Sequence, residues 1–229
     1  MRLIEGRQHF GQLTAPNPYP VRQFKPALYF GAVSLDTLKA DTVKFSGVLS
    51  SQRKSQLNQF CTQLGIPIPA DNKAYNLIDK ALTPPGAVDK RIDSNQRLEL
   101  LGDSVLATIT IQYLMSRFNS KNEGAISQLS HLLTCNVALG VMGRRMGLQN
   151  VMKLPGGFEK MPQKGRNTTL ADTVEAFIGA LYLANNNNTQ MAYKAITPFL
   201  RTMLKEVPEK LHTARNYDIA QISRQLWGN

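Results

Sequence analysis

Residues 95–106, NQRLELLGDSVL, place two carboxylates, Glu99 and Asp103, in a segment that otherwise has the pattern of a buried helix. Apolar side chains mark one face of this segment at helical spacing, at Leu98, Leu101, Val105, Leu106 and Ile109. Asp93 or Ser94 is placed to cap the start of this helix. The stretch therefore predicts a core helix that carries acidic side chains, and such charges need a chemical explanation.

A second acidic pair, Asp172 and Glu175, lies in TLADTVEAFIGALYL, residues 169–183. Residues three or four apart share a helix face, so each helix carries two like charges close together. Near apolar stripes these carboxylates repel unless a cation lies between them, and Mg²⁺ or Mn²⁺ takes oxygen ligands of this kind. On spacing alone, a solvated helix face with Lys or Arg partners is the simpler interpretation. Small residues that would let the two helices approach closely are Gly102, Ala176, Gly179 and Ala180.

Composition indicates a globular chain that binds a polyanion. The 229 residues are 42% hydrophobic, enough for one domain or at most two small ones. The formal net charge is +11, and six basic residues face three acidic ones both in 1–50 and in 186–229. RNA or DNA is the natural partner of such a chain, although some organelle proteins are simply basic.

The N-terminal region is rich in Pro and Gly and has no sustained period. Its basic character suits an organelle transit segment, a basic arm on RNA or a plain terminal extension. No run of 18 apolar residues and no secretory signal pattern occur in the sequence, so we expect a soluble chain with no membrane partner. Cys61 and Cys135 lack metal-ligand spacing, which indicates buried thiols in a reducing compartment.

Helical periodicity predicts further helices, which cover residues 51–65, 77–82, 126–147, 170–182 and the region after Thr189. From Ile126 to Val141 the apolar pattern is unbroken and predicts a single helix. Residues 159–169, EKMPQKGRNTT, are polar and basic and predict a loop, and Pro198 predicts a bend in the last helix. Few strand signals occur, so the fold class is all-α.

The two acidic segments, NQRLELLGDSVL and TLADTVEAFIGALYL, resemble the signature segments of the ribonuclease III family, usually NERLEFLGDSVL and LADTFEALIGAIYL. Residues 123–148 fit the connecting helices of that family, so the resemblance covers roughly residues 55–205. It implies a compact helical endonuclease domain that dimerises around a valley for double-stranded RNA. The activity it implies is Mg²⁺-dependent cleavage of both strands.

By motif position, the resemblance assigns the catalytic and metal-binding carboxylates to Glu99, Asp103, Asp172 and Glu175. Their implied role is to hold one or two Mg²⁺ ions, with Mn²⁺ as a substitute. These ions generate a hydroxide nucleophile and stabilise the leaving 3′ oxygen of an in-line displacement. We expect the four carboxyl groups to converge within about 4 to 8 Å of a common centre.

The sequence departs from the family pattern around this site. A position that is normally acidic is Gln96, and the family's ALTHRS is ALTPPG, with Pro84 and Pro85. The arginine-alanine pair of the family's connecting helix is also replaced, near His131. These departures leave open whether the chain is an enzyme.

Leu100 occupies the position of the motif aromatic that inserts into the partner subunit in the family. It should be apolar surface that needs a partner, and leucine is a smaller knob than an aromatic ring. We therefore predict a dimer contact at Leu100 with a different ribonuclease III-like subunit, a heterodimer rather than a tight homodimer.

The expected domain organisation has three parts: a basic extension over 1–50, a ribonuclease III-like domain over 51–206 and a helical tail over 207–229. The 25 residues after Leu204 are too few for a double-stranded RNA-binding domain, so none is expected.

Two functional interpretations follow. In basic character, single domain and N-terminal extension, the chain resembles the ribonuclease III-like proteins of the fungal mitochondrial large ribosomal subunit. This favoured interpretation predicts an rRNA-binding scaffold in the mitochondrial matrix, contacting neighbouring ribosomal proteins and needing no cofactor. The alternative is an active Mg²⁺-dependent endonuclease in the cytoplasm or nucleus. The predicted RNA-binding residues are Arg2, Arg7, Arg22, Lys25, Lys205, Lys210, Arg215 and Arg224.

Overall fold

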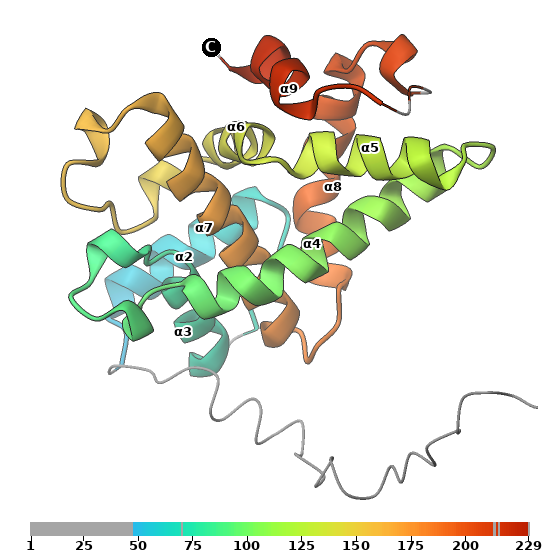
Figure 1. Cartoon of the computed structure of the whole chain (residues 1–229). Coiled ribbons are helices and arrows are strands. Elements are labelled where there is room, and N and C mark those ends of the chain that lie inside the picture. The colour runs from blue at the N-terminus through green and yellow to red at the C-terminus, as the bar shows by residue number, and fades with distance from the viewer. Residues whose placement is uncertain (1–47, 70, 213, 215, 229) are drawn as a thin grey trace, which may run out of the picture. The chain divides into compact units, whose positions relative to one another are not determined.

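The computed structural model describes residues 48–69, 71–212, 214 and 216–228, and the regular elements in these ranges are all helices (Figure 1). The α-helices are α2 (Ser51–Gln63), α3 (Asn72–Ala81), α4 (Gln96–Arg117), α5 (Glu123–Thr134), α6 (Asn136–Met146), α7 (Gln163–Ala184), α8 (Gln190–Glu206) and α9 (Ile219–Trp227). Short 3₁₀ helices are η2 (Pro85–Ala87), η3 (Arg91–Asp93), η4 (Leu148–Asn150), η5 (Phe158–Lys160) and η6 (Glu209–His212). The all-α prediction is confirmed, while the predicted extension over 1–50 lies almost wholly outside the described residues.

Helix α7 is the central element and packs against α3, α4, α6 and α8 (Figure 1). Where α7 crosses α4, the two backbones touch. A Cβ atom on Gly102 would lie 1.7 Å from the carbonyl oxygen of Glu175, and one on Gly179 would lie 2.3 Å from that of Leu98. Only glycine fits at these two positions, so the predicted close approach of the two acidic helices is present.

The start of α4 differs from the sequence prediction. The helix begins at Gln96 with Asn95 at its N-cap, rather than with Asp93 or Ser94. The Asn95 side chain does not cap the helix, because its Nδ2 donates to the carbonyl oxygen of Ala81 at 3.1 Å. Asn95 is thus a buried residue whose side-chain hydrogen bond connects the start of α4 to the end of α3.

The predicted single helix over 126–147 is wrong, because α5 ends at Thr134 and α6 starts at Asn136 with a 54° bend between them. Cys135 has an extended backbone, with φ −69° and ψ 156°. Thr, Cys and Asn are weak helix formers, and the apolar pattern continues on both sides of them. The periodicity therefore hid the break.

The predicted loop over 159–169 is also wrong in its second half, since α7 already begins at Gln163. In this polar first part of the helix, side-chain hydroxyl groups donate hydrogen bonds to backbone carbonyl oxygens. The Thr168 hydroxyl, for example, donates to the Lys164 carbonyl oxygen at 3.1 Å. Helix α8 follows Thr189 as predicted, and it continues through Pro198.

A buried ion-pair cluster ties the first helices to the middle of the chain. The Asp79 carboxylate on α3, only 7% exposed, accepts from Arg53 Nε at 2.7 Å and from Lys153 Nζ at 2.9 Å. Arg53 also donates to the carbonyl oxygen of Val151 at 2.8 Å. The Asp79 cluster, formed by these three charged side chains, joins α2, α3 and the segment after η4.

Helix α9 covers parts of α5 and α6. Its Trp227 is buried and donates from Nε1 to a Glu206 carboxylate oxygen at 2.7 Å, while Arg145 pairs with the same carboxylate at 2.9 Å. Cys61 and Cys135 are free thiols, and burial raises the pKa of Cys61 to about 12. No single described helix has the length and apolar character needed to cross a membrane, although the bent α5–α6 pair meets that requirement in length and composition alone.

Candidate metal centre

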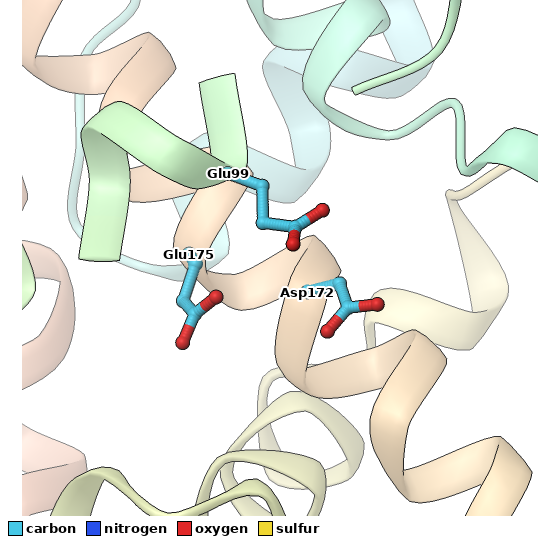
Figure 2. A group of neighbouring side chains, drawn as sticks. All are labelled: Glu99, Asp172 and Glu175. Atoms are coloured by element: carbon cyan, nitrogen blue, oxygen red, sulfur yellow. The ribbon is translucent and has the colours of Figure 1, made fainter. Parts of the chain in front are cut away.

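The α4–α7 crossing brings together three carboxylates, Glu99 from α4 and Asp172 and Glu175 from α7. One oxygen from each lies within 4.8 Å of the others, and all three residues are partly buried. Figure 2 shows the side chains extending from the two helices toward one region. The acidic cluster, as these three residues are called below, depends on the glycine contacts that let the helices touch.

The surroundings favour protonation of the acidic cluster. Burial, followed by the charges of Asp103, Asp172 and Glu99, raises the pKa of Glu175 to about 8. Burial also raises the pKa of Glu99, together with the charges of Asp172 and Asp103, while Arg91 partly opposes this shift. For Asp172 burial again raises the pKa, against a backbone hydrogen bond that lowers it. When its carboxyl groups are ionised, the cluster therefore carries negative charge that its surroundings offset only in part.

No described lysine or arginine nitrogen lies within 4.0 Å of the cluster carboxylates. Hard divalent cations prefer several carboxylate oxygens of this kind. A cation at this position would remove the mutual repulsion and compensate the desolvation of the three groups. The donor set therefore fits Mg²⁺ or Mn²⁺.

Asp103, the fourth predicted carboxylate, lies outside the group of three and is exposed to solvent. Its charge nonetheless contributes to the raised pKa of Glu175, so it is near the cluster. The altered motif position Gln96 accepts a hydrogen bond from Arg91 on η3. This bond holds a cationic side chain at the edge of the site.

Leu100 is 76% exposed, although it lies between the cluster residue Glu99 and the half-buried Leu101. Ile111 and Met115 are 40% and 60% exposed. They follow Leu100 by 11 and 15 residues, which are close to three and four helical turns, so they lie on the same side of α4 as Leu100. With Leu100 they form an exposed apolar stripe on α4 that is interrupted by the exposed Ser104. The role of Leu100 in a dimer contact stays a prediction.

The predicted RNA-binding residues separate into two groups. Arg2, Arg7, Arg22, Lys25 and Arg215 lie outside the described residues. Lys205, Lys210 and Arg224 are exposed, on α8, η6 and α9 respectively.

Sequence reasoning missed Lys164, which lines a cavity together with Arg224. Lys164 lies eight residues before Asp172, a spacing that puts the two on one side of a continuous helix. That signal was hidden because residues 159–169 looked like a loop. The Asp79 cluster was missed as well, since its members are far apart in the sequence.

Comparison with known proteins gives a consistent result. A family model described as ribonuclease-III-like matches residues 75–200. The chain is 34% identical over 137 residues to Ribonuclease 3 of Borreliella afzelii, covering 58% of this chain and 54% of that protein. It is 33% identical over 152 residues to Ribonuclease 3 of Syntrophomonas wolfei, and this match covers 66% of this chain and 63% of that protein.

Among solved structures, the chain is similar to the nuclease domain of ribonuclease III from Campylobacter jejuni, with a TM-score of 0.54 and 25% identity. The match covers 67% of this chain and 97% of that domain. The chain spans about half the length of curated relatives that it matches, from 49% to 63%. The solved structure that it matches over almost its whole length is a nuclease domain.

Proposed function

Because the chain belongs to the ribonuclease-III-like family, we propose that it binds RNA and cleaves double-stranded RNA with divalent cations held by its acidic cluster. The observation that carries this proposal is the convergence of Glu99, Asp172 and Glu175 within 4.8 Å without a described cation partner. A purely structural helix pair gains nothing from such repulsion, since all three groups are partly desolvated and the charge of Asp172 raises the pKa of both Glu99 and Glu175. The relatives named Ribonuclease 3 support the same activity.

In this proposal Glu99, Asp172 and Glu175 hold Mg²⁺, or Mn²⁺ as a substitute, and Asp103 adds negative charge at the edge of the cluster. When bound, the cations provide a nucleophile from water and stabilise the leaving 3′ oxygen. Glu175, whose pKa is about 8 without a cation, releases its proton when a cation binds. Cation affinity should therefore rise with pH through the neutral range.

The partner proposed for the exposed stripe on α4 is a second ribonuclease III-like chain. One solved neighbour, the nuclease domain from Campylobacter jejuni, is described as having a flexible region involved in dimer formation. In this chain the most exposed side chain of the stripe is Leu100, which is 76% exposed and smaller than an aromatic ring. A different subunit with a matching socket would complement it, so we retain the proposal of a heterodimer.

A second candidate function is an rRNA-binding component of a mitochondrial large ribosomal subunit, located in the matrix beside other ribosomal proteins. Two observations favour it: the net charge of +11, and the departures from the family motif at Gln96, Leu100, Pro84 and Pro85. Of these positions, Gln96 and Leu100 lie on α4, the helix that carries the cluster residue Glu99. On this proposal the cluster remains without catalytic use and no cofactor is required.

Incubation of the purified chain with a long RNA duplex and Mg²⁺ tests the first proposal. We expect cleavage that falls on the order of 10³-fold in the Asp172→Asn, Glu175→Gln double variant, because several kcal/mol of charge stabilisation are lost. The matched control, Asp89→Asn with Glu209→Gln, removes two exposed carboxylates elsewhere and should cut normally.

An intact duplex after incubation with wild-type protein would contradict the cleavage proposal. Sedimentation of native extracts then tests the second candidate. Comigration with the large ribosomal subunit, unchanged by the double variant, would support the scaffold. A free or small-complex position in the gradient would contradict it.

A further inference from the structure

A cavity of about 400 Å³ lies where the start of α6, the start of α7 and helix α9 meet. Its lining includes Asn136 of α6, Lys164 and Thr168 of α7, and Ser223 and Arg224 of α9. No aspartate or glutamate lines it among the described residues. The charged side chains that line the cavity are therefore both cationic, Lys164 and Arg224.

The two cations at this cavity have no carboxylate to neutralise them. Within the described part of the chain, no carboxylate lies within 4.0 Å of Lys164 Nζ or of the Arg224 guanidinium. Arg145, by contrast, pairs with Glu206 at 2.9 Å on the same side of the domain. Lys164 and Arg224 thus keep their donors available, which is the arrangement that recognises an anion such as phosphate.

The cavity lies in register with the acidic cluster along α7. Lys164, Thr168, Asp172 and Glu175 follow one another at four, four and three residues, so they form a single stripe on the helix. Thr168 precedes Asp172 by about 6 Å along the axis, and Lys164 precedes it by about 12 Å, at 1.5 Å per residue. An RNA strand that reaches the cluster can therefore continue along α7 into the cavity.

Helix α9 completes the cavity and is fixed firmly enough to do so. Trp227 Nε1 bonds to Glu206 at 2.7 Å, and Gln163 Nε2 on α7 donates to the Gly228 carbonyl oxygen at 3.2 Å. Asp218 caps the start of α9 through the Gln221 backbone N–H at 3.0 Å. Helix α9 lies beyond residues 75–200, which the family match covers, so the cavity is partly a feature of this chain's own C-terminal segment.

We infer that this cavity binds a backbone phosphate of the same RNA strand that reaches the acidic cluster, through Lys164 and Arg224. The inference rests on the proposed RNA-binding function. It assigns α9 a role in holding the strand, next to the site rather than within it. Because phosphate contacts position a strand without reading its sequence, the effect should be the same for duplexes of different sequence.

Binding of a short RNA duplex, measured over a range of salt concentrations without divalent cations, tests this inference. Log affinity decreases linearly with log salt concentration. For the Lys164→Gln, Arg224→Gln variant we expect the magnitude of this slope to decrease by about two, roughly one per lost phosphate contact. The matched control, Lys73→Gln with Arg201→Gln, removes one exposed lysine and one exposed arginine elsewhere and should keep the wild-type slope. The charge-retaining Lys164→Arg, Arg224→Lys variant should keep it too.

Each outcome separates this inference from the proposed function. If the wild-type chain does not bind the duplex, the proposed function fails and the phosphate site fails with it. If the wild type binds and the cavity variant keeps its slope, or the control variant loses as much, only the phosphate site is overturned. A loss in the charge-retaining variant equal to that of the Gln variant also overturns it, because charge would then not be the cause.

Discussion

A single aspartate, Asp79, and the acidic cluster of three carboxylates lie in this domain under opposite electrostatic conditions. Asp79 is 7% exposed, yet Arg53 and Lys153 neutralise it at 2.7 and 2.9 Å. The acidic cluster is less buried but has no such partners among the described residues, and its Glu175 has a pKa raised to about 8. The chain thus supplies its own cations where a carboxylate joins helices. It leaves the carboxylates at the α4–α7 crossing without such partners, and there we propose that an external cation binds.

The largest effect should come from breaking the neutralised site. Asp79→Ala leaves the Arg53 guanidinium, with 18% side-chain exposure, facing an uncompensated buried space. Removing one partner of a buried ion pair costs about 3 to 5 kcal/mol of unfolding free energy. Urea unfolding measures this loss. Lys153→Met is the control. Because the Lys153 side chain is 47% exposed, this substitution should lower the unfolding free energy by less than about 1 kcal/mol. A similar loss in both variants would contradict the view that Asp79 is the centre of the cluster.

Separating α4 from α7 should disrupt the acidic cluster instead. In Gly102→Ala the new Cβ would meet the Glu175 carbonyl oxygen at 1.7 Å, so the helices must move apart. Overpacking of this kind costs about 3 kcal/mol in unfolding free energy, and it should also weaken Mn²⁺ binding by displacing Glu175. Calorimetric titration with Mn²⁺ and urea unfolding measure the two effects. Gly156→Ala, where no atom lies within 4 Å of the new Cβ, should change neither.

The pH dependence of stability should report the raised pKa of Glu175. The folded pKa of Glu175, about 8, exceeds its ordinary value of 4.5, so the folded chain keeps a proton that the unfolded chain has released between these values. Stability from this group is present below pH 4.5 and is lost as pH rises toward 8. Discounted for solvent screening of this partly exposed carboxyl, the decrease is on the order of 3 kcal/mol. Unfolding in EDTA at pH 5 and pH 8 measures it, and Glu175→Gln should lose less between the two. An equal loss in both proteins would mean that Glu175 is not the group responsible.

The sequence was sufficient to predict the parts of this contrast that depend on local spacing. Asp172 and Glu175 share a helix face because they are three residues apart, and the small residues Gly102 and Gly179 indicated that α4 and α7 could touch. The all-α class followed from the same periodicity. Local spacing is therefore enough to place a carboxylate on a face and to suggest which faces meet.

The parts that depend on tertiary contacts could not be predicted. Asp79 pairs with Arg53 and Lys153 across 26 and 74 residues, distances over which a sequence gives no register. The break at Cys135 was invisible because both flanking helices continue the same apolar pattern. The polar start of α7 looked like a loop, and this hid the alignment of Lys164 with the acidic cluster.

The smallest effect should separate Asp103 from the three residues of the cluster. Asp103 is exposed and lies outside the 4.8 Å group, but its charge is the largest single Coulombic contribution to the raised pKa of Glu175. Asp103→Asn should therefore lower that pKa and move the loss of stability in EDTA to lower pH, while weakening Mn²⁺ binding by only about tenfold. Asp172→Asn, which removes an oxygen donor of the cluster itself, should weaken it by more than about a hundredfold, since a direct donor matters more than a supporting one. Titration of both variants with Mn²⁺ at constant pH makes the comparison. Equal losses would show that Asp103 turns inward and donates an oxygen when the cation binds, and the cluster would then be counted as four residues.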